Sequence, residues 1–247
     1  MTGISRFPTA RVSSLRTRIH HDWDLAIPEA RALQEQLRSR VVERDPRRAP
    51  RLVAGADISF DRRSPELHAA VVVLDAASLA VVEIAGVRAR ARFPYVPGYL
   101  SFREIPPLLQ AFAKLEAVPD LIVCDGQGRA HPRRFGLACH LGVLLDLPTL
   151  GCAKSRLIGD YREPGPRRGA HTQLRDGGEV IGEVVRTRSG VKPVFVSVGH
   201  RISLETARRT TLRLAARYRL PEPVRAAHRE VNRLRRLAGC TDPQSVV

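Results

Sequence analysis

Residues 120–136, which read DLIVCDGQGRAHPRRFG, contain the feature that decides the fold. The apolar run Leu121–Cys124 predicts a buried strand, and Asp125 follows directly at its end. Because open α/β sheets gather their ligand-binding groups at the carboxyl ends of strands, Asp125 is a candidate site residue. This acid could end the strand harmlessly, lie beside the phosphates of a nucleotide, or hold a metal ion.

Two nucleotide-binding patterns can be tested on the glycines after this acid. A dinucleotide-binding fingerprint would need a third glycine at the position of His131. A Walker loop would need a glycine before Lys154, where the chain has Ala153. Both patterns fail, so the two glycines are interpreted as a place where a backbone or a base can approach closely. His131 has no assigned role.

The periodicity of the remaining chain predicts three strands joined by short turns, followed by helices and strands in alternation. That alternation implies parallel strands with right-handed crossovers. The order is that of an α/β, ribonuclease H-like fold, in which a mixed central sheet of three antiparallel strands and then parallel strands is flanked by helices. The expected strands lie at 51–60, 67–75, 79–93, 121–125, 149–154, 179–186 and 193–198, and the expected helices at 27–42, 101–115, 133–145, 203–217 and 222–238.

The length of 247 residues suits a single domain, expected over residues 26–240. Residues 1–25 are expected to be a loose basic leader, and residues 159–178 a long surface loop rich in Gly, Pro, Arg and Asp. The amino-terminal region contains no apolar core of a signal peptide, and the most apolar region is interrupted by charged residues. We therefore expect a cytoplasmic protein without a membrane span, and a monomer.

The composition indicates a polyanionic partner. The chain has 41 Lys and Arg against 25 Asp and Glu, a net charge of +16, and a pI of about 11.1. Nucleic acid is the first candidate and an anionic membrane surface the second. Lysines contribute only Lys114, Lys154 and Lys192, so a GC-rich genome would account for part of the arginine excess. The four cysteines lack CxxC spacing and are expected to be reduced thiols rather than zinc ligands or disulfides.

Asp57 is the second candidate acid. Strand alternation places it on one face of the segment VAGADISF, residues 53–60, among small neighbours. A buried carboxylate needs a divalent cation or an arginine as compensation, and small neighbours allow a close approach. The alternative is an acid at the surface of an edge strand.

Glu104 is the third candidate acid, after a loop rich in Pro and Gly. The spacing Ser101-x-x-Glu104 also matches a capping box, in which the glutamate merely closes the start of a helix. Pro106 and Pro107 argue against that role, because they suit the first turn of a helix that starts nearer Glu104. Two or three converging carboxylates would make the oxygen-rich site that Mg²⁺ prefers, and would indicate metal-assisted phosphoryl chemistry.

Two cationic side chains are further candidates. Lys154 ends the strand expected beside that of Asp125, where it could contact a phosphate oxygen. The alternative is an ordinary exposed lysine at a strand end. His228 lies on the expected last helix, where a solvated surface histidine is the alternative.

Five segments in order resemble the endonuclease V family, the deoxyinosine-directed repair nucleases of ribonuclease H-like fold. The resemblance covers roughly residues 30–230, and five motifs in the family's order are a specific signal. The segments are VAGADISF (53–60), FPYVPGYLSFRE (93–104), DGQGRAHPRRFGLACHLGVLLDLPTLGCAKSRL (125–157), VSVGH (196–200) and LPEPVRAAH (220–228).

The resemblance implies a catalytic centre in which Asp57, Glu104 and Asp125 hold Mg²⁺, with Mn²⁺ as a substitute. It implies that Lys154 supports the phosphate, and it assigns His228 to the edge of the metal site. Some relatives carry another polar residue at that last position.

The resemblance also implies how the lesion is recognised. One group of residues would form a stiff wedge that enters the duplex beside the lesion, unless this segment is an ordinary proline-rich connector. A second group would line the pocket for the flipped hypoxanthine, whose weak pairing lowers the cost of flipping. The wedge residues are Pro94, Tyr95, Val96 and Pro97. The pocket residues are Gly98, Gly126, Gly128 and Leu157.

The implied reaction is Mg²⁺-dependent hydrolysis of the second phosphodiester bond 3′ to a deaminated base, chiefly deoxyinosine, leaving 3′-hydroxyl and 5′-phosphate ends. The implied partner is DNA with deaminated bases. An inosine-specific ribonuclease or another structure-specific nuclease is an alternative, because no residue visibly reads a 2′-hydroxyl. A non-enzymatic nucleic-acid-binding protein is the other alternative, and the three acids argue against it because they would repel phosphates without a metal.

Overall fold

The computed structural model describes residues 15–60 and 64–240, with the side chains of residues 239 and 240 excepted. Within this part, one sheet of eight strands is flanked by five helices. The strands are β1 (Leu52–Phe60), β2 (Glu66–Asp75), β3 (Val81–Arg90), β4 (Leu121–Cys124), β5 (Thr149–Ala153), β6 (His171–Asp176), β7 (Glu179–Val185) and β8 (Val194–His200). The helices are α1 (Ile27–Arg38), α2 (Leu100–Phe112), α3 (Leu137–Leu145), α4 (Leu204–Leu214) and α5 (Glu222–Cys240).

The sheet is mixed, in the order β3-β2-β1-β4-β5-β8-β7-β6. Strands β1, β2 and β3 form an antiparallel meander, and β4 and β5 run parallel to β1. The α/β class with a mixed central sheet flanked by helices is therefore confirmed. The expectation that the strands after the meander are all parallel is wrong, since β8, β7 and β6 are antiparallel. No helix connects β5 to β8, and a parallel pairing would have needed such a crossover.

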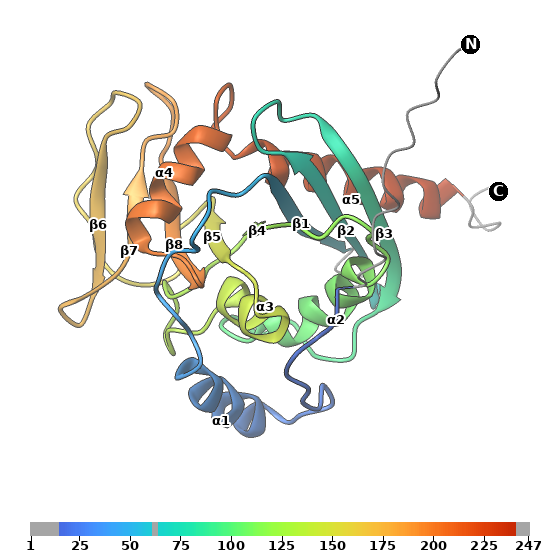
Figure 1. The fold of residues 1–247 in the computed structure, drawn as a ribbon. Coiled ribbons are helices and arrows are strands. Elements are labelled where there is room, and N and C mark those ends of the chain that lie inside the picture. The colour runs from blue at the N-terminus through green and yellow to red at the C-terminus, as the bar shows by residue number, and fades with distance from the viewer. Residues whose placement is uncertain (1–14, 61–63, 241–247) are drawn as a thin grey trace, which may run out of the picture.

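Helices cover both faces of the sheet (Figure 1). Helices α2 and α3 pack on one face, where Ile105 and Leu141 lie in the same apolar cluster as Ala54. Helices α4 and α5 pack on the other face, where Val224 joins a cluster with Val53. The alternation of Val53 and Ala54 between the two clusters follows the pleat of β1. Helix α1 lies beyond α3, on the side away from the sheet.

Gly55 determines how closely α5 approaches β1. A Cβ at this position would overlap the backbone carbonyl of Pro223, in the first turn of α5. Because strand alternation puts Gly55 and Asp57 on the same face, the close approach brings α5 against Asp57 as well. The expectation that the small residues around Asp57 allow a close approach is confirmed.

Residues 15–25 pack against the core. Trp23 contacts the apolar clusters around α2, and Nε2 of His21 lies 2.8 Å from Nε2 of buried His140. The expectation of a loose leader is therefore wrong for this part, because its few apolar and aromatic residues make separate contacts without a regular period. The preceding residues, 1–14, lie outside the described part of the chain.

Strand β6 lies inside the segment that we expected to be a surface loop. Only Leu174 of β6 is buried, and the other five positions are polar or charged and reach solvent. A single buried position gives no alternation from which a strand could be predicted. The expectation is wrong for residues 171–176, because this edge strand is specified by its pairing with β7.

Two expectations from composition concerned the cysteines and a membrane span. Cys124, Cys139 and Cys152 are buried and unpaired, as expected for reduced thiols, and the side chain of Cys240 lies outside the description. None of the helices in the described ranges has an apolar stretch long enough to cross a bilayer.

Replacing Gly55 with Ala is expected to lower the free energy of unfolding by about 1–3 kcal/mol, because the new methyl group must push back the backbone of Pro223. Thermal denaturation followed by circular dichroism measures this change. Gly165→Ala is the matched control, since its Cβ would meet Ala170 at an ordinary 3.6 Å. Equal midpoints for wild type and Gly55→Ala would contradict this account of the contact.

Candidate active site

Asp57, inside β1, and Asp125, directly after β4, lie side by side. Ala56 pairs with Cys124 across these parallel strands, and the backbone N–H of Asp125 donates to the carbonyl of Ala56 at 3.4 Å. The two acidic side chains are largely buried, at 11% and 12% exposure. Two carboxylates in such a position repel each other when both are ionised.

Each of these acids contacts a nitrogen of one cationic or imidazole side chain. Nζ of Lys154, directly after β5, lies 2.6 Å from Oδ2 of Asp125. Nδ1 of His228, on α5, lies 2.8 Å from Oδ2 of Asp57. Lys154 and His228 are both exposed, so the acids are reached from solvent on this side. The prediction that Lys154 lies beside Asp125, at the end of the neighbouring strand, is confirmed.

Asp57, Asp125 and His228 form a candidate metal centre. Each supplies one ligand atom, and the three atoms lie within 4.8 Å of one another. Two carboxylate oxygens and one imidazole nitrogen are donors that a divalent cation accepts. Among the described residues, Glu104 does not belong to this group, so the structure places His228 where we expected the third acid.

Glu104 faces the same cavity as Asp125 and feels the charge of both other acids. Burial raises the pKa of Glu104 to about 8, and the charges of Asp57 and Asp125 contribute to the rise. Burial and the charge of Asp125 likewise raise the pKa of Asp57 to about 6, against the opposing effect of His228. Burial and mutual repulsion therefore both disfavour the state in which all three acids are ionised.

Helix α2 presents Glu104 without using it as a cap. The first turn shows no side-chain capping bond within the described structure, and Oγ of Ser101 lies 3.1 Å from Nδ1 of His140 instead. The capping-box alternative is therefore excluded. Pro106 and Pro107 lie inside the helix rather than in its first turn. The argument from these prolines was therefore wrong, although its conclusion that Glu104 does not cap the helix holds.

A cavity of about 480 Å³ opens beside the acids. Glu104, Asp125 and Lys154 line one part of it, and Leu137 and Leu157 supply apolar wall. Cavities of this size accept small ligands such as a nucleobase.

Most of the predicted pocket residues line this cavity. Those that do are Gly98, Gly126 and Leu157. Gly128 does not, and the expectation for it is wrong. Its N–H donates to Oγ of Ser197 at 2.8 Å, and a Cβ at this position would overlap the carbonyl of Val198. Gly128 is glycine because the turn packs against β8, not because a base approaches it.

The predicted wedge, residues 94–97, borders the mouth of the cavity. Tyr95 and Pro97 line it, and Pro94 and Val96 complete the loop. The Tyr95 side chain is 52% exposed, with its ring centroid 5.7 Å from that of Phe60. An exposed ring at the mouth of a cavity is free to stack on a base.

His131 holds the backbone of the wedge loop at Gly98. Its Nε2 donates to the carbonyl of Gly98 at 2.9 Å, and its Nδ1 accepts from the N–H of Arg133 at 3.2 Å. Burial, together with the charge of Arg133, lowers the pKa of His131 to about 4, so the ring is neutral at pH 7. This side chain, which had no assigned role, therefore holds Gly98 in place.

Two residues that we did not predict hold the same carbonyl. Nη2 of Arg133 donates to Gly98 at 2.6 Å and Nε2 of Gln34 at 3.2 Å. Gly98 has a φ of +81°, in the left-handed region that favours glycine. The available signal was Gln34 itself, a polar residue on the apolar face of α1 between buried Ala30 and Leu37.

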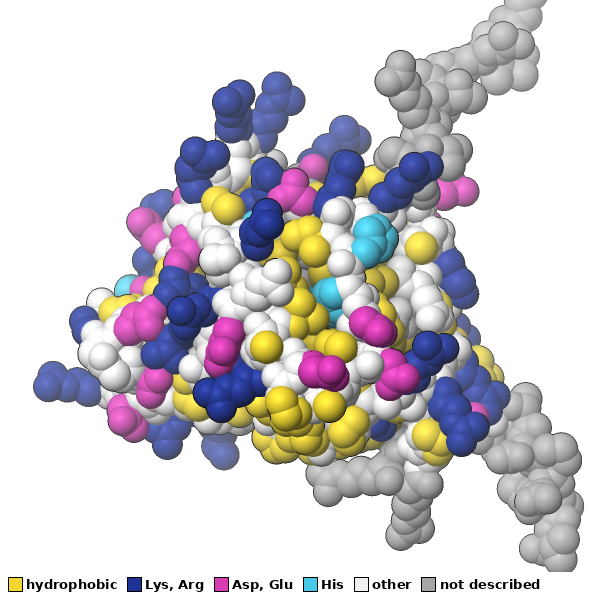
Figure 2. All heavy atoms as spheres, turned by 90° about the horizontal axis from the view of Figure 1, so that it is seen from below, with side chains coloured by type: hydrophobic (Ala, Val, Ile, Leu, Met, Phe, Trp, Pro, Cys, Tyr) yellow, Lys and Arg dark blue, Asp and Glu magenta, His cyan; other side chains and the backbone are white. Residues whose placement is uncertain are grey.

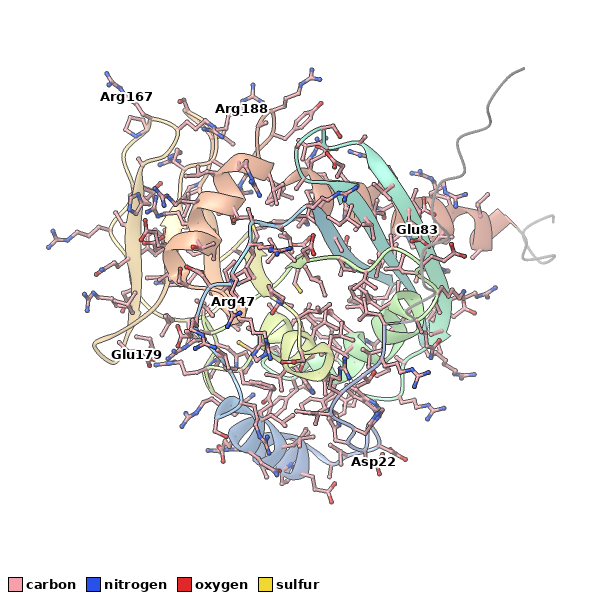
Figure 3. The ribbon with its side chains drawn as sticks, viewed as in Figure 1. Asp22, Arg47, Glu83, Arg167, Glu179 and Arg188 are labelled. Atoms are coloured by element: carbon pink, nitrogen blue, oxygen red, sulfur yellow. The ribbon has the colours of Figure 1, made fainter. Side chains whose placement is uncertain are left out.

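The basic residues are spread over the surface. They stand mainly around the edge of the face shown in Figure 2, whose middle shows hydrophobic patches together with acidic side chains and uncharged surface. Figure 3 places Arg167 and Arg188 near each other at one end of the molecule, away from Glu179. Arg129 and Arg134 pair with Glu179. The excess charge therefore does not by itself locate a binding face.

Comparisons with known proteins agree with this geometry. The profile of the endonuclease V family matches residues 35–229. The endonuclease V of Roseiflexus sp. (strain RS-1) is 53% identical over 205 residues, which are 83% of this chain and 91% of the relative.

Solved structures show the same similarity. The crystal structure of endonuclease V from Streptomyces avermitilis has a TM-score of 0.85 at 48% identity, covering 92% of this chain and 100% of that one. Ciona intestinalis endonuclease V, in complex with a 24mer DNA containing an inosine followed by a ribo-adenosine, has a TM-score of 0.77 at 30% identity, covering 86% and 98%. The family profile spans most of the chain and includes Asp57, Asp125 and His228, so this protein belongs to the endonuclease V family of nucleases.

Proposed function

We propose that this protein nicks DNA at deaminated bases, chiefly deoxyinosine. It hydrolyses the second phosphodiester bond 3′ to the lesion and leaves 3′-hydroxyl and 5′-phosphate ends. The observation that carries the proposal is the meeting of Asp57, Asp125 and His228 beside a cavity large enough to accept a nucleobase. Membership of the family supports the nuclease chemistry, and the inosine-containing DNA bound by the Ciona relative supports the substrate.

Mg²⁺ is the proposed cofactor, with Mn²⁺ as a substitute. Asp57 and Asp125 supply the carboxylate oxygens that a hard cation prefers, and Nδ1 of His228 lies within reach of the same point. Burial first, and then the charges of the neighbouring acids, raise the pKa values of Asp57 and Glu104, so a divalent cation beside them would favour their ionised forms. When bound, the cation supplies water activation and stabilisation of the leaving oxygen.

The side chains around this centre have separate tasks in the proposal. Asp57 and Asp125 hold the cation, and Glu104 completes the shell from the cavity wall. Lys154, which now pairs with Asp125, donates to a phosphate oxygen and offsets the charge that develops there. His228 orients the carboxylate of Asp57 through the contact with Nδ1.

Recognition of the lesion belongs to the other part of the cavity. Tyr95 and its flanking prolines enter the space left by the flipped base, and the exposed ring stacks on the neighbouring base. Gly98 and Gly126 present backbone to the base edge without side-chain hindrance. Because the cut lies one bond away from the flipped base, recognition of the base and hydrolysis of the phosphodiester bond take place in different parts of the site.

Cleavage of inosine-containing RNA is the second candidate activity. The DNA bound by the Ciona relative carries a ribo-adenosine directly after the inosine, which favours keeping this alternative. The proposal is completed by a single domain, with residues 15–25 packed against it, that acts as a monomer in the cytoplasm.

Asp125→Ala is expected to reduce nicking of a deoxyinosine duplex in Mg²⁺ by more than about 100-fold, because the variant loses a ligand of the cation. Binding of the same duplex is expected to persist, since the change removes negative charge. A nicking gel and fluorescence anisotropy measure the two quantities. Glu35→Ala removes an exposed acid of α1 and is the matched control. Nicking by Asp125→Ala within tenfold of wild type contradicts the proposal.

Glu104→Gln is expected to stabilise the metal-free protein at pH 8 and to have little effect at pH 5. The pKa of Glu104 rises from the model-peptide value of 4.5 to about 8 on folding, so its contribution to wild-type stability is full below pH 4.5 and is lost as the pH rises toward 8. Glutamine keeps its amide at both pH values. In EDTA at pH 8, the free energies of unfolding of the wild type and Glu104→Gln, obtained from melting curves, should differ by more than about 1 kcal/mol.

Saturating Mg²⁺ is expected to reduce this difference at pH 8, because the cation offsets the charge of Glu104. Glu35→Gln, at the exposed acid of α1, is the control for non-specific charge effects. Identical curves for wild type and Glu104→Gln in EDTA at pH 8 would show that burial and the neighbouring acids do not raise the pKa of Glu104.

Tyr95→Ala is expected to weaken binding of the lesion duplex by about 5- to 100-fold, the range for loss of one base–aromatic stack. The melting temperature should hardly change, because the side chain is half exposed. Tyr218→Ala, at another exposed tyrosine outside the cavity, is the control. An equal loss of affinity for undamaged duplex would show that Tyr95 is not a lesion wedge.

A further inference from the structure

A second cavity, of about 470 Å³, lies between the end of β3 and α2, and we call it the cationic cavity. Arg90 ends β3, Arg92 follows it, and Arg103 belongs to α2. None of the described residues that line the cavity is acidic, and its apolar wall includes Trp23 and Phe102. A sugar–phosphate backbone, with anionic phosphates and apolar sugar faces, suits a surface of this composition.

Two of these arginines have no anionic partner in the protein. The side chains of Arg90 and Arg92 are exposed, and neither makes a hydrogen bond or an ion pair with another described residue. Glu66 is opposite Arg90 in the register of β2 and β3, but its carboxylate contacts Arg88. The arginines that contact Glu179, in contrast, are offset by its charge. The positive charge at the cationic cavity is therefore available to an anionic ligand.

The wedge tyrosine stands between this cavity and the acids. Tyr95 lines the cavity that contains Asp125, whereas Arg103 lines the cationic cavity. The two side chains are joined by Phe60, whose ring centroid is 5.7 Å from that of Tyr95 and 5.3 Å from the guanidinium of Arg103. Nη1 of Arg103 also donates to the carbonyl of Phe93, directly before the wedge. The two cavities therefore lie on opposite sides of the wedge loop.

The pairing of the strands gives the span between the acids and the arginines. Asp57 is opposite Ala70 of β2, and Ala70 is opposite Gly86 of β3. Because β1 and β3 are both antiparallel to β2, they run in the same direction, and Arg90 lies four residues beyond Gly86. At about 4.8 Å between strands and about 3.3 Å per residue, the Cα atoms of Asp57 and Arg90 are roughly 16 Å apart.

This span is suitable for the two backbones of one duplex. A DNA groove is about 6 Å wide on the minor side and about 12 Å wide on the major side. Arginine side chains are long and reach some of the remaining distance. The acids and the arginines can therefore contact different strands at the same time.

We propose that the cationic cavity binds the backbone of the uncut DNA strand, with Arg90 and Arg92 as its phosphate contacts. The inference rests on the proposed function. A wedge that enters a duplex has one backbone on each side of it. When the strand to be cut lies at Asp57 and Asp125, its partner strand lies across the wedge, at the arginines. Anchors on both sides hold the duplex in place while Tyr95 enters it.

The wall of the cationic cavity also gives a task to the segment before α1. The ring of Trp23 is stacked on that of buried His140, with centroids 5.5 Å apart, and meets Phe102 edge-on at 6.3 Å. The wall is therefore preformed. Phosphate contacts carry no sequence information, so this surface is expected to hold damaged and undamaged duplexes equally.

The test compares nicking of a deoxyinosine duplex with nicking of the same deoxyinosine strand without its partner. The double variant Arg90→Ala/Arg92→Ala is expected to lower kcat/KM on the duplex by about 5- to 50-fold at low salt, because two phosphate contacts are lost. The slope of log kcat/KM against log salt concentration should become shallower by about 2. On the single strand, kcat/KM should stay close to the wild-type value.

Arg47→Ala/Arg48→Ala is the matched control. It removes the same charge from exposed side chains outside both cavities and should change kcat/KM on the duplex much less. Both double variants should melt like the wild type, because the side chains are exposed. Equal losses on duplex and single strand, an unchanged duplex activity, or an equal loss in the control variant would each overturn the inference.

A second measurement uses the duplex alone. Single phosphates of the uncut strand are replaced one at a time by uncharged methylphosphonates. At one or two positions the replacement should lower kcat/KM of the wild type but not of Arg90→Ala/Arg92→Ala, since the two changes remove the same contact. A wild type that is insensitive at every position overturns the inference. No nicking of either form of the DNA by the wild type contradicts the proposed function itself, whereas nicking without this strand dependence contradicts only the role of the cationic cavity.

Discussion

The repulsion between the carboxylates of Asp57 and Asp125 is the constraint on which the rest of the site depends. The parallel pairing of β1 with β4 places the two acids next to each other, and burial deprives them of water. Lys154 comes from the next parallel strand, and His228 comes from a helix that reaches β1 only because Gly55 has no side chain. The fold therefore brings these acids together at one place, and their repulsion is what the proposed divalent cation would offset.

The cavity beside the acids differs from the acidic group in the residues that form it and in the contacts that hold them. Its walls are made mainly from backbone and apolar side chains, and its polar atoms are fixed by contacts behind the wall. Gln34, His131 and Arg133 hold the carbonyl of Gly98, and Ser155 holds the amide of Gln127. A preformed wall can read the edge of a base without moving, so recognition and hydrolysis can occupy neighbouring parts of one site.

Much of this arrangement could be predicted from sequence, because local patterns specify it. The alternation around Asp57 places this acid in a strand, the apolar run before Asp125 places that acid at the end of another, and the order of strands puts Lys154 beside Asp125. The packing of Gly128 against β8 could not be predicted, since a glycine in a turn looks the same whether it faces a ligand or a backbone.

Other features depend on contacts between distant segments. Strand β6 is specified by its pairing with β7, and Gln34 reaches the loop of Gly98 from a helix 64 residues earlier in the chain. Neither contact produces a periodic pattern in the sequence from which it could be predicted. His228 was predicted at the edge of the metal site, and the folded chain adds that its Nδ1 lies 2.8 Å from Oδ2 of Asp57, a contact between α5 and β1 that no local pattern indicates.

The central claim is that a cation held by Asp57 and Asp125 cuts the strand one bond beyond a flipped inosine. The most direct measurement maps the cut made by the wild-type protein on end-labelled strands with a single inosine, in DNA and in RNA, with Mg²⁺ or with EDTA. The account predicts one nick at the second phosphodiester bond 3′ to deoxyinosine in Mg²⁺ and none in EDTA. Equal cleavage in EDTA, or cuts that do not depend on the position of inosine, would contradict it.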